Sequence, residues 1–195
     1  MGNDYRVAVP EGRSGPWRVE RFTVPEMDVK ALQYALHGRP VDPGTYTRLI
    51  RDGDHDPMMS DTPMEVRDHL AAIYEIRQRG GRVLVNGLGL GVILQAALSC
   101  PNVTHVDVVE IDRDIIDLVW PTYAANPRAH IHHADAYTIS WPKGMRWNVA
   151  WHDIWPTLTT DNFPLMTKLH RKYGRRVDWQ ESWGRDWLKA HYREG

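Results

Sequence analysis

Three glycines spaced two apart, with an acid further along the chain, are the residues of this sequence best suited to chemistry. Gly87, Gly89 and Gly91 follow an apolar run, and Glu110 closes a second apolar run about 20 residues later. Glycines carry no Cβ, so a ligand can lie against bare backbone, and a helix that starts there presents unpaired N–H groups. The acid can accept hydrogen bonds from both hydroxyls of a ribose. The spacing therefore predicts a nucleotide site, with a plain glycine-rich crossover as the alternative.

The segments around the glycines must position them, and their patterns are those of one strand–helix–strand unit. The runs Arg82–Val85 and Val103–Val109 are apolar and β-branched, which predicts two strands. Val92–Leu98 between them is apolar and alanine-rich, which predicts a helix. Further strands are predicted at 129–133, 147–153 and 175–183, and helices at 112–119, 163–171 and 186–192. The dehydrogenase pattern G-x-G-x-x-G is not met. We expect an α/β fold built on a Rossmann-like sheet.

Acidic residues follow two of the later predicted strands. Asp135 and Ala136 follow the strand at 129–133, and Asp153 ends the strand at 147–153. In doubly wound sheets ligands lie beyond the carboxyl ends of the strands, which places Asp153 beside a ligand of the glycine turn. Asp153 or its neighbour His152 could take a proton from a bound acceptor, although alternation along a strand turns the two side chains to opposite sides. The alternatives are a turn-forming Asp135 and a helix-capping Asp153.

Residues 1–80 are predicted to form a separate N-terminal segment. Its expected parts are a loose arm at 1–16, strands at 17–24 and 45–51, and helices at 28–37 and 60–79. On the last helix Glu65 and His69 share a face and would flank the mouth of the glycine turn. A capping or salt-bridge role is the alternative for this pair. We therefore divide the chain into an N-terminal β/helix segment, 1–80, and a Rossmann-like domain, 81–195.

Composition argues against several functional classes. The formal net charge of −1 shows no basic excess, which argues against a nucleic-acid partner held by phosphate neutralisation. Cys100 is the single cysteine, so an internal disulfide and a cysteine metal cluster are excluded. His130, His132 and His133 occur without a metal-binding motif, and we expect no metal site. No apolar run suits a signal sequence or a bilayer span, so we expect a cytoplasmic protein with no membrane partner.

The stretches VLVNGLGLG and VDVVEID resemble motifs I and II of class I S-adenosylmethionine (SAM)-dependent methyltransferases. They are most similar to the spermidine-synthase branch, because the apolar Val85 stands where most methyltransferases carry an acid. The resemblance implies SAM as the cofactor, held by the three glycines and Glu110, with Asp135 and Ala136 at the adenine. Too few residues remain for the two closing strands of that fold, so we expect a shortened C-terminus.

The same resemblance assigns residues to the acceptor. It implies that Asp153 is the acid or base and that Glu65 and His69 match a Glu-x-x-x-His pair of the branch, although Pro63 replaces the tyrosine of that pattern.

Two departures from the branch concern the reaction itself. Leu90 stands where its members carry the Asp that holds the ammonium of decarboxylated SAM, and Trp155 stands where they carry a second acid for a polyamine. Apolar and aromatic side chains cannot pair a desolvated ammonium. We therefore expect methyl transfer to a small acceptor, such as an aromatic or heterocyclic one, packed against Trp151 and Trp155. An aminopropyltransferase with a different amine and a non-catalytic SAM or nucleoside binder stay open, as does a homodimer.

Overall fold

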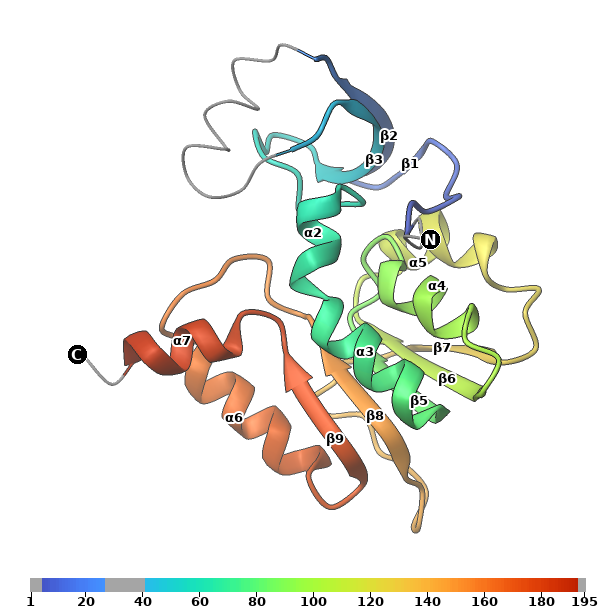
Figure 1. Cartoon of the computed structure of the whole chain (residues 1–195), viewed down its shortest axis with the longest axis vertical. Helices are drawn as coiled ribbons and strands as arrows, with labels where there is room; N and C mark the ends of the chain where they lie inside the picture. Colours follow the sequence, from blue (N-terminus) through green and yellow to red (C-terminus); the bar gives the residue numbers. More distant parts are fainter. Residues whose placement is uncertain (1–4, 27–40, 193–195) are drawn as a thin grey trace.

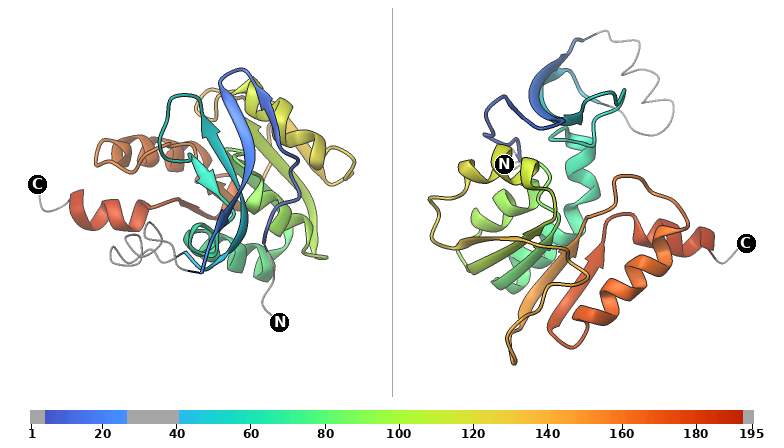
Figure 2. Two further views of the ribbon diagram at one scale, coloured as in Figure 1. Left: turned by 90° about the horizontal axis from the view of Figure 1, so that it is seen from above. Right: turned by 180° about the vertical axis from the view of Figure 1, so that it is seen from behind.

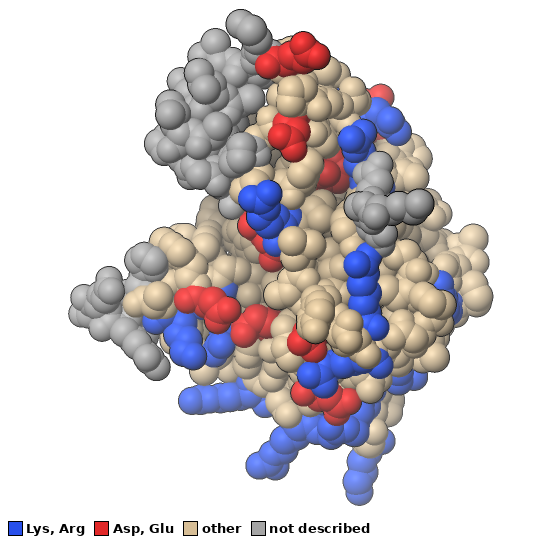
Figure 3. Space-filling model, viewed as in Figure 1, with Lys and Arg blue, Asp and Glu red and all other residues tan. Residues whose placement is uncertain are grey.

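The computed structural model describes residues 5–26 and 41–192 of the 195-residue chain. The helix predicted at 28–37 lies outside these residues. The described elements form two sheets, with helices on both faces of the larger one (Figure 1 and Figure 2). Within the described residues no helix is both long and apolar enough to cross a bilayer. Charged side chains are spread over the face drawn in Figure 3, with Lys and Arg gathered at its lower end.

The larger sheet is parallel and has five strands in the order β7-β6-β5-β8-β9. Its central strand, β5 (Gly81–Asn86), pairs with β6 (Val103–Glu110) on one side and β8 (Trp147–His152) on the other. The edges are β7 (Ala129–His133) and β9 (Val177–Ser182). Parallel strands covered on both faces need apolar sequence, which β5 supplies at Val83–Val85 and β6 at Val106, Val108 and Val109. The predicted Rossmann-like α/β fold is confirmed.

Each face of this sheet has its own apolar core. One core is covered by α3 (Leu70–Arg79), α4 (Val92–Leu98) and α5 (Arg113–Val119), which a 3-10 turn (Trp120–Thr122) follows. The other is covered by α6 (Asn162–Tyr173) and α7 (Arg185–Tyr192). Alternate residues of β5 enter opposite cores, since Val83 and Val85 belong to the first and Leu84 to the second.

The smaller sheet is antiparallel and stands beyond the helices of the first core (Figure 1). Its strands, in sequential order, are β1 (Gly12–Ser14), β2 (Trp17–Val24), β3 (Gly44–Arg51) and β4 (Met59–Ser60). Trp17 ties this sheet to α5, because its Nε1 donates a hydrogen bond to Asp112 Oδ2 at 2.7 Å. The division predicted at residue 80 stays a prediction.

The loose arm predicted at 1–16 is packed over its described part. Val7 and Val9 are buried in the first core, and β1 pairs with β2. The Val7 N–H donates to Asp61 Oδ2 at 2.9 Å, and the Thr47 N–H donates to Asp61 Oδ1 at 2.6 Å. One buried carboxylate therefore holds the arm against β3, a long-range contact that local composition does not reveal.

The single helix predicted at 60–79 is two helices. α2 (Pro63–Asp68) begins after Thr62, whose Oγ1 accepts a hydrogen bond from the Glu65 N–H at 3.4 Å. His69 lies between α2 and α3 with φ −100° and ψ −3°, and its side chain is buried. The break lets α2 connect to the small sheet while α3 packs beside β8 (Figure 1).

Candidate functional site

The glycine turn after β5 has a backbone that only glycine adopts readily. The φ angles of Gly87, Gly89 and Gly91 are +98°, +49° and +79°, and Gly91 is the N-cap of α4. A Cβ on Gly91 would lie 2.6 Å from the ring of Tyr123, whose hydroxyl donates to the Leu90 carbonyl at 3.2 Å. The turn is therefore fixed from one side by Tyr123 as well as by its own conformation.

Glu110, at the carboxyl end of β6, is bonded directly to this turn. The carboxylate is buried, and its Oε2 accepts from the Leu88 N–H at 2.8 Å. Its Oε1 accepts from the Ile111 and Asp112 N–H groups at 2.8 and 2.9 Å. A carboxylate can accept about four hydrogen bonds, so Glu110 has roughly one position left for a ligand hydroxyl. It could bind a second hydroxyl only if the Leu88 N–H gave up its hydrogen bond to Oε2.

Met59 is a residue of this site that the sequence did not indicate. Its Sδ lies 2.5 Å from the position that a Cβ on Gly89 would occupy and accepts from the Leu90 N–H at 3.2 Å. The side chain comes from β4, a two-residue strand 30 positions before Gly89. A thioether of this chain therefore covers the backbone that a nucleotide would contact, and a bound ligand must move it.

Asp135 and Ala136 follow β7 on the same edge of the sheet. The Ala134 N–H donates to the Glu110 carbonyl at 2.9 Å, which brings this loop beside Glu110. Asp135 Oδ1 accepts from the Tyr137 N–H at 2.7 Å, the turn-forming role that was the alternative for this residue. The partly exposed carboxylate can still accept further hydrogen bonds, so its expected contact with the adenine stays a prediction.

Asp153 follows β8 directly beside the glycine turn. Its N–H donates to the Asn86 carbonyl at 2.8 Å, and its own carbonyl lies against Gly87. Burial, together with the nearby carboxylates of Glu65 and Asp68, raises the pKa of Asp153 to about 7. A carboxyl group that titrates near neutral pH can both take and return a proton, which suits acid–base chemistry.

His69, at the break between α2 and α3, and Glu65, within α2, both lie near Asp153. His69 Nε2 lies 3.9 Å from Asp153 Oδ2. Burial lowers the pKa of His69 to about 4, against the opposing charge of Asp68, so the imidazole is neutral at pH 7. Its Nδ1 is buried and has no hydrogen-bond partner among the described residues. The sequence missed Asp68, although it precedes His69 directly.

His152 points away from this group. The ring is fully buried, with Nδ1 2.7 Å from Asn86 Nδ2 and Nε2 3.1 Å from Gln180 Oε1. An amide nitrogen can only donate, so Nδ1 accepts and Nε2–H donates to Gln180. Burial lowers the pKa of His152 to about 4. Both ring nitrogens are thus engaged inside the sheet, and the structure does not bring His152 together with the other predicted catalytic residue.

The two tryptophans predicted to line one acceptor pocket lie in different cores. Trp151 belongs to the first core and packs edge-on against His69, with ring centroids 5.8 Å apart and planes at 86°. Its Nε1, like His69 Nδ1, has no partner among the described residues. Trp155 belongs to the second core together with Ala136. Of the two, Trp151 contacts His69, whereas Trp155 packs in the core on the other face of the sheet.

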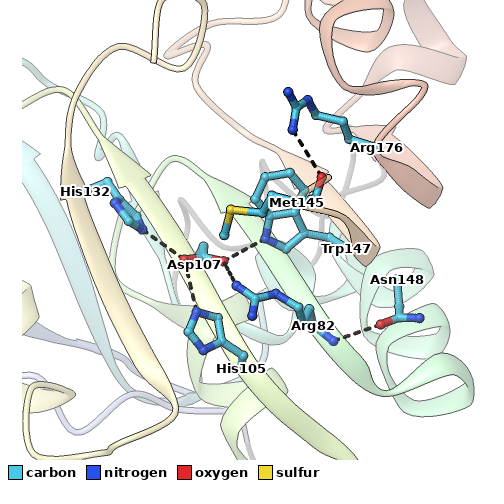
Figure 4. Close-up of polar contacts among 8 residues, drawn as sticks. All are labelled: Arg82, His105, Asp107, His132, Met145, Trp147, Asn148 and Arg176. Carbon is cyan, nitrogen blue, oxygen red and sulfur yellow. Dashed lines mark hydrogen bonds and ion pairs between the residues drawn. The ribbon is translucent and has the colours of Figure 1, made fainter. Parts of the chain in front are cut away.

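A second polar cluster, which the sequence analysis also missed, surrounds Asp107 in the middle of β6 (Figure 4). Its carboxylate accepts hydrogen bonds from His132 at 2.9 Å, His105 at 3.2 Å, Trp147 at 2.7 Å and Arg82 at 3.2 Å. Burial disfavours the charged form, but the bonds from His132 and Trp147 outweigh it and hold the pKa of Asp107 well below its usual range. An acid inside the run VDVV was the available signal.

The histidines of this cluster do not form a metal centre in the described part of the chain. There, no group of three or more His, Cys, Asp or Glu residues is arranged to hold a metal ion. His130 instead stacks on His105, with ring centroids 4.0 Å apart.

Comparison with known proteins supports the fold assignment. No protein-family model matches this chain, and no curated protein sequence does. Among solved structures, spermidine synthase from Thermotoga maritima is 17% identical, with a TM-score of 0.57 over 94% of this chain and 61% of that chain. The N-methyltransferase NodS from Bradyrhizobium japonicum is 10% identical, with a TM-score of 0.47 over 59% of this chain and 63% of that chain.

Most of the similar solved structures are methyltransferases. This chain spans less than two thirds of the length of the spermidine synthase it matches, at 61%. Its α/β sheet is thus the Rossmann-like fold of spermidine synthase, which its two motifs predicted.

Proposed function

We propose that this chain binds SAM at the glycine turn and transfers its methyl group to a small acceptor held beside Asp153. The observation that carries the proposal is the position of Asp153. A carboxyl group with a pKa of about 7 is hydrogen-bonded through its backbone to the strand that ends in the glycine turn. A proton acceptor thus stands next to the predicted nucleotide site.

The residues around the turn fit this cofactor in type and in placement. Glu110 would bond the ribose, and Asp135 with the Ala136 N–H would hold the adenine. The Leu90 N–H, once Met59 moves, would face the remainder of the ligand. SAM supplies an electrophilic methyl group. This chain positions the acceptor and takes its proton at Asp153, while His69 stays neutral and Trp151 packs edge-on against it.

The charges near Asp153 favour an acceptor that bears a nitrogen. Glu65 and Asp68 both act on Asp153, and a protonated amine would be attracted by their carboxylates before losing its proton. Because Trp155 lies in the other core, an acceptor stacked between two tryptophans is less well supported than one held by charge.

Aminopropyl transfer remains the second candidate because of one specific observation. The likeness to spermidine synthase extends over 94% of this chain, and the acids near Asp153 suit an amine. Against it, Leu90 is fully buried in apolar surroundings and cannot hold the ammonium of decarboxylated SAM. A non-catalytic SAM or nucleoside binder is the third candidate.

Titration calorimetry with SAM tests the cofactor assignment. We expect Glu110→Ala to weaken SAM binding at least tenfold, because hydrogen bonds to a charged group contribute about 1.5–3 kcal/mol each. Glu110→Gln keeps an acceptor for the Leu88 N–H and should fold like the unmutated chain, with intermediate affinity. A folded Glu110→Ala variant with unchanged SAM affinity would contradict the assignment of a nucleotide site at the glycine turn. Formation of the demethylated cofactor with a panel of small amines then separates an enzyme from a binder.

A further inference from the structure

Positive charge is concentrated at one end of the molecule. Seven of the 24 Lys and Arg residues, but only one of the 25 Asp and Glu residues, lie in 142–148 and 167–178. Figure 3 shows Lys and Arg side chains projecting from its lower end, where β8, β9 and α6 lie in Figure 1. We call this the cationic surface; it comprises Lys143, Arg146, Lys168, Arg171, Lys172, Arg175 and Arg176. The net charge of −1 therefore conceals a basic end on an otherwise acidic chain.

The cations of α6 and of the turn after it form a stripe. Lys168, Arg171 and Lys172 share one side of α6 by their spacing, and Arg175 follows two residues after the helix ends. Lys168, Arg171 and Arg175 are exposed, and none of them forms an ion pair with a described residue. These three exposed like charges repel one another, and a polyanion would relieve that repulsion.

An aromatic side chain lies beside this stripe in a fixed position. The rings of Trp141 and Trp147 meet edge-on, with centroids 4.8 Å apart, and Trp141 Nε1 donates to the Tyr173 hydroxyl at 3.4 Å. Lys172 and Arg176 hold the loop that carries Trp141, by donating to the Ile139 carbonyl at 2.6 Å and the Pro142 carbonyl at 2.9 Å.

Space is open next to Trp141. Hollows of about 300 Å³ and about 480 Å³ both border it, the first lined also by Lys172 and Arg176 and the second by His132 and Met145. Figure 4 shows the Arg176 side chain directed at the Met145 backbone, beside Trp147. A flat ring next to cations and open space can receive another flat ring.

We propose that the cationic surface binds single-stranded nucleic acid, with phosphates on the α6 stripe and one base against Trp141. A positive surface that follows the backbone, combined with an aromatic platform, is how proteins hold unpaired strands. A duplex or an acidic peptide could bind the positive charges, but neither offers an unpaired base to stack on Trp141. The surface lies at the start of β8, whereas Asp153 follows its end roughly 20 Å away, so the proposal does not depend on the glycine turn.

Fluorescence anisotropy with labelled RNA and DNA strands of about 12 nucleotides tests this, using the full chain. Reversing the stripe with Lys168→Glu, Arg171→Glu and Arg175→Glu should weaken binding at least tenfold at about 50 mM salt and flatten its salt dependence. The matched control reverses three exposed cations elsewhere that form no ion pair with a described residue, with Arg21→Glu, Arg51→Glu and Arg67→Glu, and should change affinity less than about threefold. An equal loss in both variants would show that net charge alone acts, and would overturn the proposal.

Trp141 separates a single strand from the other polyanions. Trp141→Ala should weaken strand binding about tenfold, and Trp141→Phe should restore most of it, because a stacking ring is kept. A matched duplex, or polyglutamate of similar length, that binds as tightly as the strand would show the proposal wrong. Preference for RNA or for DNA would identify the source of the strand, and either supports the proposal. An unchanged urea unfolding transition in the stripe variant verifies its fold and keeps this test independent of the cofactor site.

Discussion

At the scale of single residues, the site depends on where each carboxylate lies rather than on how many there are. Glu110 accepts three backbone hydrogen bonds, whereas Asp153 lies beside the carboxylates of Glu65 and Asp68. Burial and those like charges raise the pKa of Asp153 to about 7. Two acids at the ends of the strands that flank β5 are thereby suited to different work, Glu110 to holding a ligand and Asp153 to moving a proton.

Asp153→Asn should abolish a pH-dependent limb of activity. The base acts when deprotonated, so the rate of methyl transfer should rise as the pH passes about 7 and then level off. The asparagine variant should lose about 10²–10⁴-fold in rate, together with that limb. His152→Gln serves as the control, since both nitrogens of His152 are bonded inside the sheet. If the rate of the Asp153→Asn variant still rose with pH near pH 7, another group would be the base that takes the acceptor's proton.

The donor preference follows from Leu90. The unmutated chain should bind SAM at least tenfold more tightly than decarboxylated SAM, a difference of about 1.4 kcal/mol, because no carboxylate stands there for the free ammonium. Competitive calorimetry measures this directly. Leu90→Asp is a poor test, since the residue is fully buried in the first core and a carboxylate there would threaten the fold. Tighter binding of decarboxylated SAM would restore aminopropyl transfer as the leading function.

At the scale of elements, two short pieces of the N-terminal segment complete the site. The break at His69 directs α2 and α3 so that an imidazole reaches Asp153, and β4 carries Met59 to the glycine turn. Both features lie where an element ends. The first core contains residues of the arm and of the glycine turn together, so the segment before residue 80 is part of the wall around the site.

Met59→Ala should tighten SAM binding about fivefold. The ligand would no longer have to break the bond from the Leu90 N–H to the thioether, a difference of about 1 kcal/mol. Calorimetry on Met59→Leu provides the control, because leucine keeps the cover but accepts no hydrogen bond, and should fall between the two. Weaker binding by Met59→Ala would make Met59 a ligand contact instead of a cover.

At the scale of the whole molecule, the fold is two apolar cores joined through one sheet, with neutral histidines buried among them. Burial lowers the pKa values of His69, His152 and His170 to about 4, 4 and 3. These rings stabilise the folded state only while uncharged, so their contribution is present above pH 6.5, the value in the unfolded chain, and is lost below it.

The free energy of unfolding should therefore fall as the pH is lowered from 6.5 towards 4. Three histidines bind protons in the unfolded chain but not in the folded one, while Asp153, with its raised pKa, does the reverse. The net difference of about two protons gives a slope of about 2 to 3 kcal/mol per pH unit, measurable by urea denaturation. His152→Gln should remove about half of that slope. A free energy of unfolding that stays constant between pH 6.5 and 4 would mean that these three histidines take up protons in the folded chain as they do in the unfolded one.

The sequence by itself determined the strands and helices of the Rossmann-like sheet and the glycine turn. Those features follow from local periodicity and from glycine's freedom at positive φ, both of which neighbouring residues decide. The carboxyl ends of parallel strands meet at one edge, so Glu110, Asp135 and Asp153 could be placed there before any coordinates.

Tertiary structure alone decided the rest. The inward direction of His152, the separation of Trp151 from Trp155, the cover formed by Met59 and the packed arm each depend on contacts between residues far apart in the chain. The position of the cationic surface is also decided by the tertiary structure, because the net charge of −1 is a sum over the chain and does not say where the charged side chains lie. Periodicity reports which face of an element is apolar, whereas only packing determines which distant side chain meets it.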